Sequence, residues 1–337
     1  MSENISNIEK KPRIFSGIQP SGNITIGNYF GALKNWVEMQ DDFETFYCVV
    51  DLHAITLRQE PAKLRAKTRE LLALYIATGL DPVTNIIYPQ SHVRQHAELA
   101  WILNCFTYMG ELNRMTQFKD KSAKNETNIN AGLYTYPILM AADILLFQTD
   151  VVPIGSDQKQ HLELTRDLAQ RFNSTFSDTF IVPEPYFGKV GARIKSLQDP
   201  MAKMSKSDPN PNGAIAILDP PNIIKNKVKR AVTDSIGEIN YVDAQPGVKN
   251  LVDIYCCASG ETVEQAMDKF NGQNYGVLKS SVTDALVGEL EPIQAEFNRL
   301  IKDKKYLDDI IKTNSEKASY IAEKTLRKVK KKVGFIV

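Results

Sequence analysis

Two segments of the chain combine residue types and spacings that suit phosphate chemistry. The first, residues 16–28 (SGIQPSGNITIGN), lies between an expected strand and an expected helix and contains glycines at positions 17, 22 and 27. Glycine allows a close approach of the backbone to a ligand, and the first N–H groups of a helix are available to an anion. The segment matches neither G-x-G-x-x-G nor G-x-x-x-x-G-K-[ST], which disfavours the usual dinucleotide and P-loop sites. Taken alone, it is also compatible with an ordinary turn.

The second segment is Lys203-Met204-Ser205-Lys206-Ser207, within a region rich in Pro, Gly, Lys and Ser. Two flexible ammonium groups three residues apart, flanked by hydroxyls, suit a mobile loop that neutralises a triphosphate as charge develops on its leaving group. An isolated K-x-x-K is usually a solvated surface loop, but the complete five-residue pattern is far more specific. We therefore treat it as a candidate phosphate-neutralising loop.

The elements that must position these residues alternate between short apolar runs and helical periodicity. We expect strands at 14–15, 46–50, 86–88 and 151–154, and helices at 29–39, 62–78, 97–109, 133–147 and 157–172. This alternation predicts an α/β fold with a doubly wound, parallel, Rossmann-like sheet. Ligands of such sheets bind at the carboxyl ends of the strands. Functional residues should therefore follow Ile18, Val50, Tyr88 and Val152.

The remainder of the chain predicts a smaller, all-helical domain. Residues 183–220 have the composition of loops with at most short strands, and helical periodicity returns at 223–232, 248–258, 262–270, 275–301 and 306–333. We expect a catalytic domain over residues 1–200, a mobile loop over 201–212 and a helical region over 213–337. The last helix could pack back on the first domain.

The composition excludes several classes of protein. The chain has 337 residues, of which 43% are hydrophobic and 24% charged, values typical of a globular protein with two domains and not of a disordered or disulfide-stapled chain. Its four cysteines match no zinc or iron–sulfur spacing. A formal net charge of +1 argues against coating nucleic acid by bulk charge.

The sequence also predicts a cytoplasmic protein without membrane contact. The apolar stretch 138–147 is about half a membrane span and contains Asp143. The first residues mix acidic and basic side chains with no apolar core of a signal peptide. Scattered cysteines fit a reducing compartment.

Beyond these patterns, the chain resembles the bacterial tryptophanyl-tRNA synthetases, a family of class I aminoacyl-tRNA synthetases, from Ile14 to about Arg327. Residues 25–28 (TIGN) occupy the place of the class signature His-Ile-Gly-His, where this family commonly has Thr and Asn, and residues 203–207 match the second signature in full. Some family members carry an iron–sulfur cluster, for which this chain has no suitable cysteines. The matching blocks are IFSGIQPSGNITIGN (14–28), GELNRMTQFKDKS (110–122), YPILMAADILL (136–146), VPIGSDQKQHLELTRDLAQRFN (152–173), VGARIKSL (190–197) and KMSKSDPN (203–210).

The resemblance implies a homodimeric ligase that activates L-tryptophan with ATP, with Mg²⁺ bound to the substrate, and transfers tryptophan to the 3′ end of tRNA(Trp). The residues that it implies for catalysis are Thr25, Asn28, Lys203 and Lys206. The residues that it implies for ATP binding are Gln19, Pro20, Ser21, Gly27, Asn28, Gly155, Ser156, Asp157, Ile194, Lys203, Met204, Ser205, Lys206 and Ser207.

The resemblance also implies a tryptophan pocket in which Asp143 accepts the indole N–H. The indole ring offers one donor and no acceptor, so a carboxylate is a suitable recognition group. The neighbours of Asp143 within 140–146 are apolar, which favours burial with a partner over exposure to solvent. The other implied pocket residues are Tyr136, Met140, Gln158, Phe15, Gly17 and His53.

Several other residues allow a structural and a functional interpretation. His53 fits a core or cap histidine as well as a pocket residue, and Lys119 and Lys121 could reach phosphates or lie on a solvated face. The sequence predicts structural or surface positions for His92, His96 and His161, and core positions for Trp36 and Trp101. Lysines and arginines gather at 225–230 and 317–332, either as solvated helix faces or as tRNA contacts.

Other functions remain open at this point. A tyrosyl-tRNA synthetase also uses a pocket carboxylate, although the blocks at 137–146 and 155–167 favour tryptophan. A small-molecule nucleotidyltransferase would have no use for a helical RNA platform after residue 222. A pure RNA-binding module would leave the segments at 16–28 and 203–207 unexplained.

Overall fold

A five-stranded parallel sheet organises the first half of the chain. The computed structural model describes residues 11–116, 129–155, 158–186, 194–206 and 208–337. The strands lie in the order β3-β2-β1-β4-β5, so the chain runs outward from β1 to β3 and then crosses back to β4. This order confirms the doubly wound sheet, with its switch point between β1 and β4. The strands are β1 (Arg13–Ile18), β2 (Glu44–Val49), β3 (Ile86–Pro89), β4 (Val151–Pro153) and β5 (Glu184–Tyr186).

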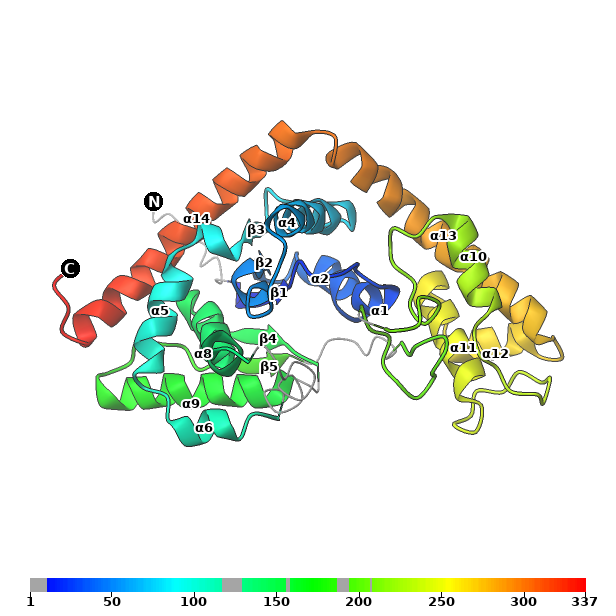
Figure 1. Cartoon of the computed structure of the whole chain (residues 1–337), viewed down its shortest axis with the longest axis horizontal. Helices are drawn as coiled ribbons and strands as arrows, with labels where there is room; N and C mark the ends of the chain where they lie inside the picture. The colour runs from blue at the N-terminus through cyan, green and yellow to red at the C-terminus, as the bar shows by residue number, and fades with distance from the viewer. Residues whose placement is uncertain (1–10, 117–128, 156–157, 187–193, 207) are drawn as a thin grey trace, which may run out of the picture.

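Helices cover both faces of the sheet (Figure 1). In β2, Tyr47 and Val49 join the core that contains α2 and α4, whereas Phe46 and Cys48 join the core formed with α5, α8 and α9. Because successive side chains of a strand point to opposite faces, a strand covered on both sides carries a continuous apolar run, here residues 46–49. The helices of this part are α1 (Ile26–Asn28), the π-helical turn η1 (Tyr29–Leu33), α2 (Lys34–Met39), α3 (Asp51–Ala54), α4 (Pro61–Ala77), the 3₁₀ turn η2 (Gln90–His92), α5 (Gln95–Asn104), α6 (Met109–Asn113), α8 (Ala131–Leu146) and α9 (Lys159–Thr175).

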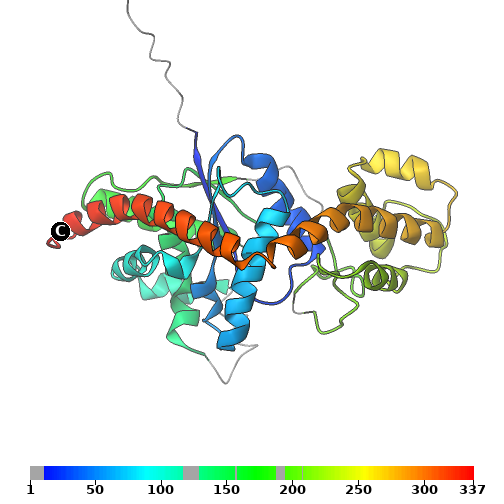
Figure 2. The same ribbon diagram turned by 90° about the horizontal axis from the view of Figure 1, so that it is seen from above.

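The second half of the described chain is helical, as expected. The helix α13 packs against α10 and α11 and also reaches α4. The following helix, α14, runs back along the sheet domain and contacts β3 and α5, as Figures 1 and 2 show. None of the described helices is long and apolar enough to span a bilayer. The helices of this half are α10 (Pro221–Lys229), α11 (Pro246–Ser259), α12 (Val263–Phe270), α13 (Tyr275–Leu300) and α14 (Lys304–Lys332).

The structure differs from the sequence-based expectation around α5. The predicted helix over 97–109 ends at Asn104, and a separate helix, α6, begins at Met109. The new start is fixed by Glu111, whose Oε2 accepts a hydrogen bond from the backbone N–H of Tyr108 at 2.9 Å. The prediction of a core position is wrong for Trp101, which is 70% exposed, and correct for Trp36, which is 2% exposed.

Gly247, in the first turn of α11, gives a direct test of how α11 packs against the backbone at Val232. A Cβ atom there would lie 2.2 Å from the carbonyl oxygen of Val232, a backbone atom that cannot rotate away. We expect Gly247→Ala to lower the free energy of unfolding by about 1–3 kcal/mol, the usual cost of overpacking. Chemical denaturation followed by circular dichroism measures this change.

The matched control is Gly288→Ala in α13, where a Cβ atom would meet nothing within 4 Å. This control should be neutral or stabilise the helix by up to about 1 kcal/mol. Equal denaturation midpoints for the two variants would contradict the packing described for α11.

Candidate active site

The first loop is shaped by a close strand contact and a reciprocal helix cap. A Cβ atom on Gly17 would lie 2.8 Å from the carbonyl oxygen of Cys48, so only glycine fits beside β2. At the start of α1, Thr25 Oγ1 accepts the N–H of Asn28 at 3.3 Å, and Asn28 Oδ1 accepts the N–H of Thr25 at 3.2 Å. This capping box satisfies two backbone N–H groups at the helix start.

Two distant segments hold the first loop in place through backbone hydrogen bonds. The N–H of Ile26 donates to the carbonyl of Ile215 at 2.9 Å, and the N–H of Ile217 donates to the carbonyl of Ile24, also at 2.9 Å. The lysine-rich loop is held by the N–H of Met204, which donates to the carbonyl of Ile194 at 3.1 Å. The two candidate segments also meet directly, since Lys206 bonds the carbonyl of Gln19 and Met204 lies beside Gly27.

Met204 anchors the lysine-rich loop by burial. Its side chain is 2% exposed, and a Cβ atom added to Gly27 would make ordinary contact with both Met204 (3.5 Å) and Ile194 (3.7 Å). These distances place the lysine-rich loop and Ile194 against the start of α1. Because Met is apolar and flexible, it fills irregular gaps well.

Lys206 also contacts the first loop. Its Nζ donates a hydrogen bond to the carbonyl oxygen of Gln19 at 3.4 Å, and its Cβ lies 3.2 Å from where a Cβ of Gly22 would be. Burial lowers the pKa of the Lys206 ammonium from 10.5 to about 8, because a desolvated cation is disfavoured. A lysine with a lowered pKa beside a glycine-rich loop is a candidate for pairing with an anionic ligand.

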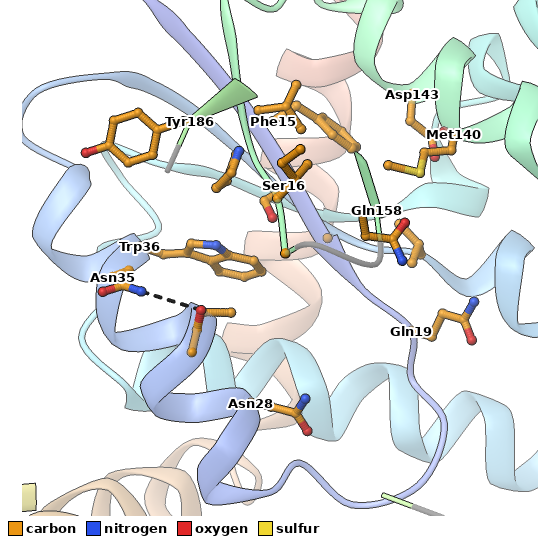
Figure 3. A pocket seen from close by; sticks show the side chains of 18 of the residues that line it. Phe15, Ser16, Gln19, Asn28, Asn35, Trp36, Met140, Asp143, Gln158 and Tyr186 are labelled. Atoms are coloured by element: carbon orange, nitrogen blue, oxygen red, sulfur yellow. Dashed lines mark hydrogen bonds between the residues drawn. The ribbon is translucent and has the colours of Figure 1, made fainter. Parts of the chain in front are cut away.

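A cavity of about 610 Å³ opens beside these two segments, at the carboxyl ends of β1, β2 and β4. This is the position that the switch point of a doubly wound sheet predicts. Figure 3 shows Asp143, Met140 and Gln158 at one end of the cavity and Trp36, Asn35 and Tyr186 at the other. The predicted site residues that line it are Phe15, Gly17, Gln19, Gly27, Asn28, His53, Tyr136, Met140, Asp143, Gly155, Gln158, Ile194 and Lys203.

Other predicted site residues lie at the margin of this cavity or outside the described part of the chain. Thr25 is 2% exposed and serves the helix cap, and Pro20 lines a separate cavity of about 110 Å³. Met204 and Lys206 hold the lysine-rich loop against the first loop, and Ser21 and Ser205 belong to these same two loops. The residues outside the described ranges are Ser156, Asp157 and Ser207, together with Lys119 and Lys121.

The centre of the site is a buried carboxylate. Asp143 is 1% exposed, as the apolar run around it predicted. Its Oδ1 accepts hydrogen bonds from Gln90 Nε2 and His96 Nδ1, each at 2.6 Å. Its Oδ2 accepts a hydrogen bond from His53 Nε2 at 2.8 Å. These three donors come from η2, α5 and α3, each of which lies beyond the carboxyl end of β2 or β3.

The surroundings of Asp143 favour its ionised form. Burial alone would raise the pKa of this carboxyl group and is the largest single influence. The charges and hydrogen bonds of His96 and His53 act in the opposite direction, and together they hold its pKa below the ordinary value. The site therefore presents a permanent hydrogen-bond acceptor at neutral pH.

Three residues of this site were not predicted from the sequence. His96, expected to be structural or on the surface, is fully buried and bonds Asp143. Gln90 follows β3 and donates to the same carboxylate, and His161 Nε2 lies 2.8 Å from the hydroxyl of the pocket residue Tyr136. The signal for Gln90 was available, because it comes directly after the strand end at which functional residues were expected.

The described residues contain no group of three or more His, Cys, Asp or Glu side chains arranged to hold a metal ion. Cys48 is buried in the core, Cys105 is exposed, and Cys256 and Cys257 lie in α11. The histidines near the cavity instead serve as hydrogen-bond partners of Asp143 and Tyr136.

Comparison with known proteins agrees with this architecture. Residues 6–291 match the family model described as tRNA synthetases class I (W and Y). The chain is 60% identical to a tryptophan–tRNA ligase of Clostridium tetani over 329 residues, which is 98% of this chain and 97% of that one. The chain therefore belongs to the class I tRNA synthetase family of tryptophan and tyrosine.

Solved structures give the same result. A tryptophanyl-tRNA synthetase from Mycoplasma pneumoniae superposes with a TM-score of 0.88 at 35% identity, covering 97% of this chain and 98% of that one. The enzyme from Campylobacter jejuni, complexed with ADP and tryptophan, superposes with a TM-score of 0.83 at 33% identity, covering 96% of this chain and all of that one.

Proposed function

We propose that this protein is a tryptophan–tRNA ligase. It activates L-tryptophan with ATP to give tryptophanyl-adenylate and pyrophosphate, and then transfers the tryptophanyl group to the 3′ end of tRNA(Trp). High identity to tryptophan–tRNA ligases over nearly the whole chain supports this function. The observation that carries it within this molecule is the buried, ionised Asp143 in a cavity bordered by the first loop and Lys203.

Tryptophan is selected by its ring N–H. In this proposal Asp143 accepts that N–H while Tyr136, Met140, Gln158, Phe15 and His53 enclose the ring, and Gly17 leaves space beside it. A site built to bond a substrate N–H rejects an analogue without it by about 10⁴–10⁵ in kcat/KM, because its buried acceptor is then left unpaired. Such a pocket needs no editing step.

Activation is a displacement at phosphorus in which no side chain acts as a nucleophile. A carboxylate oxygen of tryptophan attacks the α-phosphorus of ATP and forms a new P–O bond, while the bond to the β-phosphate oxygen breaks and its electron pair leaves with pyrophosphate. Lys203 and Lys206 neutralise the charge that grows on the leaving group. In the second step a ribose hydroxyl of the terminal tRNA nucleotide, the 2′-hydroxyl by resemblance to the family, attacks the acyl carbon and releases AMP.

In this proposal Mg²⁺ is bound by the phosphates of ATP and not by the protein. The carboxylate among the described residues that line the cavity is Asp143, whose oxygens already accept from Gln90, His96 and His53. Because these carboxylate oxygens are already engaged in hydrogen bonds, the residues of the cavity do not fit a metal ion held by the protein. The phosphates of ATP are the oxygen ligands that Mg²⁺ prefers.

The helical region has the features of a platform for tRNA. We assign catalysis to residues 1–200, a mobile loop to 201–212 and tRNA binding to 213–337, in a cytoplasmic homodimer. Lys225, Lys229 and Arg230 lie exposed on and just after α10, and a few such cations can contact phosphates without making the whole protein basic. Lys227, in the same helix, instead forms an ion pair with Asp219 at 2.7 Å.

The function is tested by ATP–pyrophosphate exchange with each amino acid, followed by aminoacylation of unfractionated tRNA. We expect exchange that depends on tryptophan, and charging of a tryptophan-accepting tRNA. Exchange that depends on tyrosine would instead establish the tyrosyl enzyme. Transfer of AMP from ATP to a small-molecule acceptor with release of pyrophosphate, and no tRNA-dependent release of AMP, would establish a nucleotidyltransferase.

Lys206 predicts a specific pH dependence. Its pKa of about 8 means that the free enzyme loses this positive charge as the pH rises through 8. Since kcat/KM reports ionisations of the free enzyme, kcat/KM for ATP should fall by about tenfold per pH unit above that value. Lys206→Arg keeps its charge at these pH values and should remove most of this alkaline decrease.

Lys206→Ala provides the control. It should reduce exchange by about 10²–10³-fold, the usual effect of removing one charge-stabilising group, with the dissociation constant of tryptophan unchanged. An alkaline decrease that is identical in the wild type and in Lys206→Arg would contradict the role of this ammonium group.

A further inference from the structure

His96 lies behind Asp143, outside the cavity itself. It belongs to α5 and is fully buried, and its ring bridges two side chains. Nδ1 lies 2.6 Å from Asp143 Oδ1, and Nε2 lies 3.0 Å from the hydroxyl of Tyr88. His96 and Tyr88 do not line the cavity, so neither of them is placed to contact a ligand there.

The protonation of this bridge follows from its partners. An ionised carboxylate can only accept hydrogen bonds, so Nδ1 of His96 must carry the proton that it shares with Asp143. The hydroxyl of Tyr88 occupies the other ring nitrogen, and burial raises its pKa well above the ordinary value, so it keeps its proton. With both ring nitrogens engaged, the imidazole has one stable orientation.

The two oxygens of Asp143 are used differently. Oδ1 accepts two hydrogen bonds, from Gln90 and His96, neither of which lines the cavity. Among the described residues, Oδ2 accepts a hydrogen bond from His53, which does line the cavity. A carboxylate oxygen has about two acceptor positions. Oδ1 is therefore saturated from the protein side, and Oδ2 keeps an acceptor position on the cavity side.

We propose that His96, held by Tyr88, is a positioning residue that fixes the carboxylate of Asp143 so that Oδ2 receives the ring N–H of tryptophan. This assignment rests on the proposed function and adds a residue that touches no substrate. Without the Nδ1 donor, only Gln90 and His53 hold the carboxylate, and Oδ1 is left with an unfilled, buried acceptor position. The orientation of the carboxylate is then less well fixed, which weakens the bond from the ring N–H to Oδ2.

The test compares tryptophan with its sulfur isostere, β-(3-benzothienyl)alanine, which has the same shape but no N–H. The variants are His96→Leu, His96→Asn and Tyr88→Phe. The amide nitrogen of asparagine replaces Nδ1 of histidine as a donor, so His96→Asn keeps the bond to Asp143. The matched control is His92→Leu, at an exposed position four residues earlier in the same segment.

We expect His96→Leu to lower kcat/KM for tryptophan by about 10- to 100-fold in ATP–pyrophosphate exchange, the effect of removing a hydrogen bond to a charged group. The same variant should change kcat/KM for the isostere by less than about threefold, so the preference for tryptophan falls by about 10- to 100-fold, with KM for ATP unaltered. His96→Asn should restore most of that preference, Tyr88→Phe should give an intermediate loss, and His92→Leu should match the wild type.

If His96 had a purely structural role, its replacement would lower kcat/KM for tryptophan and for the isostere in the same proportion. That result would overturn the assignment, as would an unaltered preference for tryptophan in His96→Leu and Tyr88→Phe. Melting temperatures identify any variant that fails to fold, in which case Tyr88→Phe and His96→Asn decide the question. An unmodified protein without tryptophan-dependent exchange would contradict the proposed function and the assignment with it. Normal exchange with an unaltered preference contradicts the assignment alone.

Discussion

The ionised carboxylate of Asp143, buried among apolar residues, is the interaction on which the site depends. A buried charge is strongly unfavourable unless hydrogen bonds replace its hydration. Here the replacement comes from three elements at once, since His53 lies in α3, Gln90 in η2 and His96 in α5. The carboxylate is therefore stable only when β2, β3 and α8 are correctly assembled, which couples the tertiary structure to substrate selection.

A second constraint is the joining of segments that are far apart in the sequence. The first loop bonds to residues 215–217, and the lysine-rich loop bonds to residues 194–196. Met204 supplies the apolar anchor and Lys206 supplies a partly desolvated charge. The same contact thus orders the loop and weakens the hydration of the cation that it carries, so an incoming phosphate meets a cation with few waters to displace.

Much of this arrangement was predictable from the sequence because it rests on local signals. Apolar strands and helical periodicity predicted the sheet and the helical second half, and the resemblance to the family implied that residues 16–28 and 203–207 serve one ATP site. Other features depend on tertiary contacts. Trp101 falls on an apolar stripe yet faces solvent. A helix expected to reach residue 109 ends at Asn104, and Glu111 caps the start of a separate helix. His96 gave no sequence signal, since its role depends on the fold that brings it to Asp143.

The most direct measurement is a crystal structure of the protein with L-tryptophan in the cavity. We expect the indole nitrogen to lie about 2.7–3.2 Å from Oδ2 of Asp143, with Oδ1 still bonded to Gln90 and His96. An indole ring bound with its nitrogen directed away from Asp143, or bonded to a different side chain, would contradict the account.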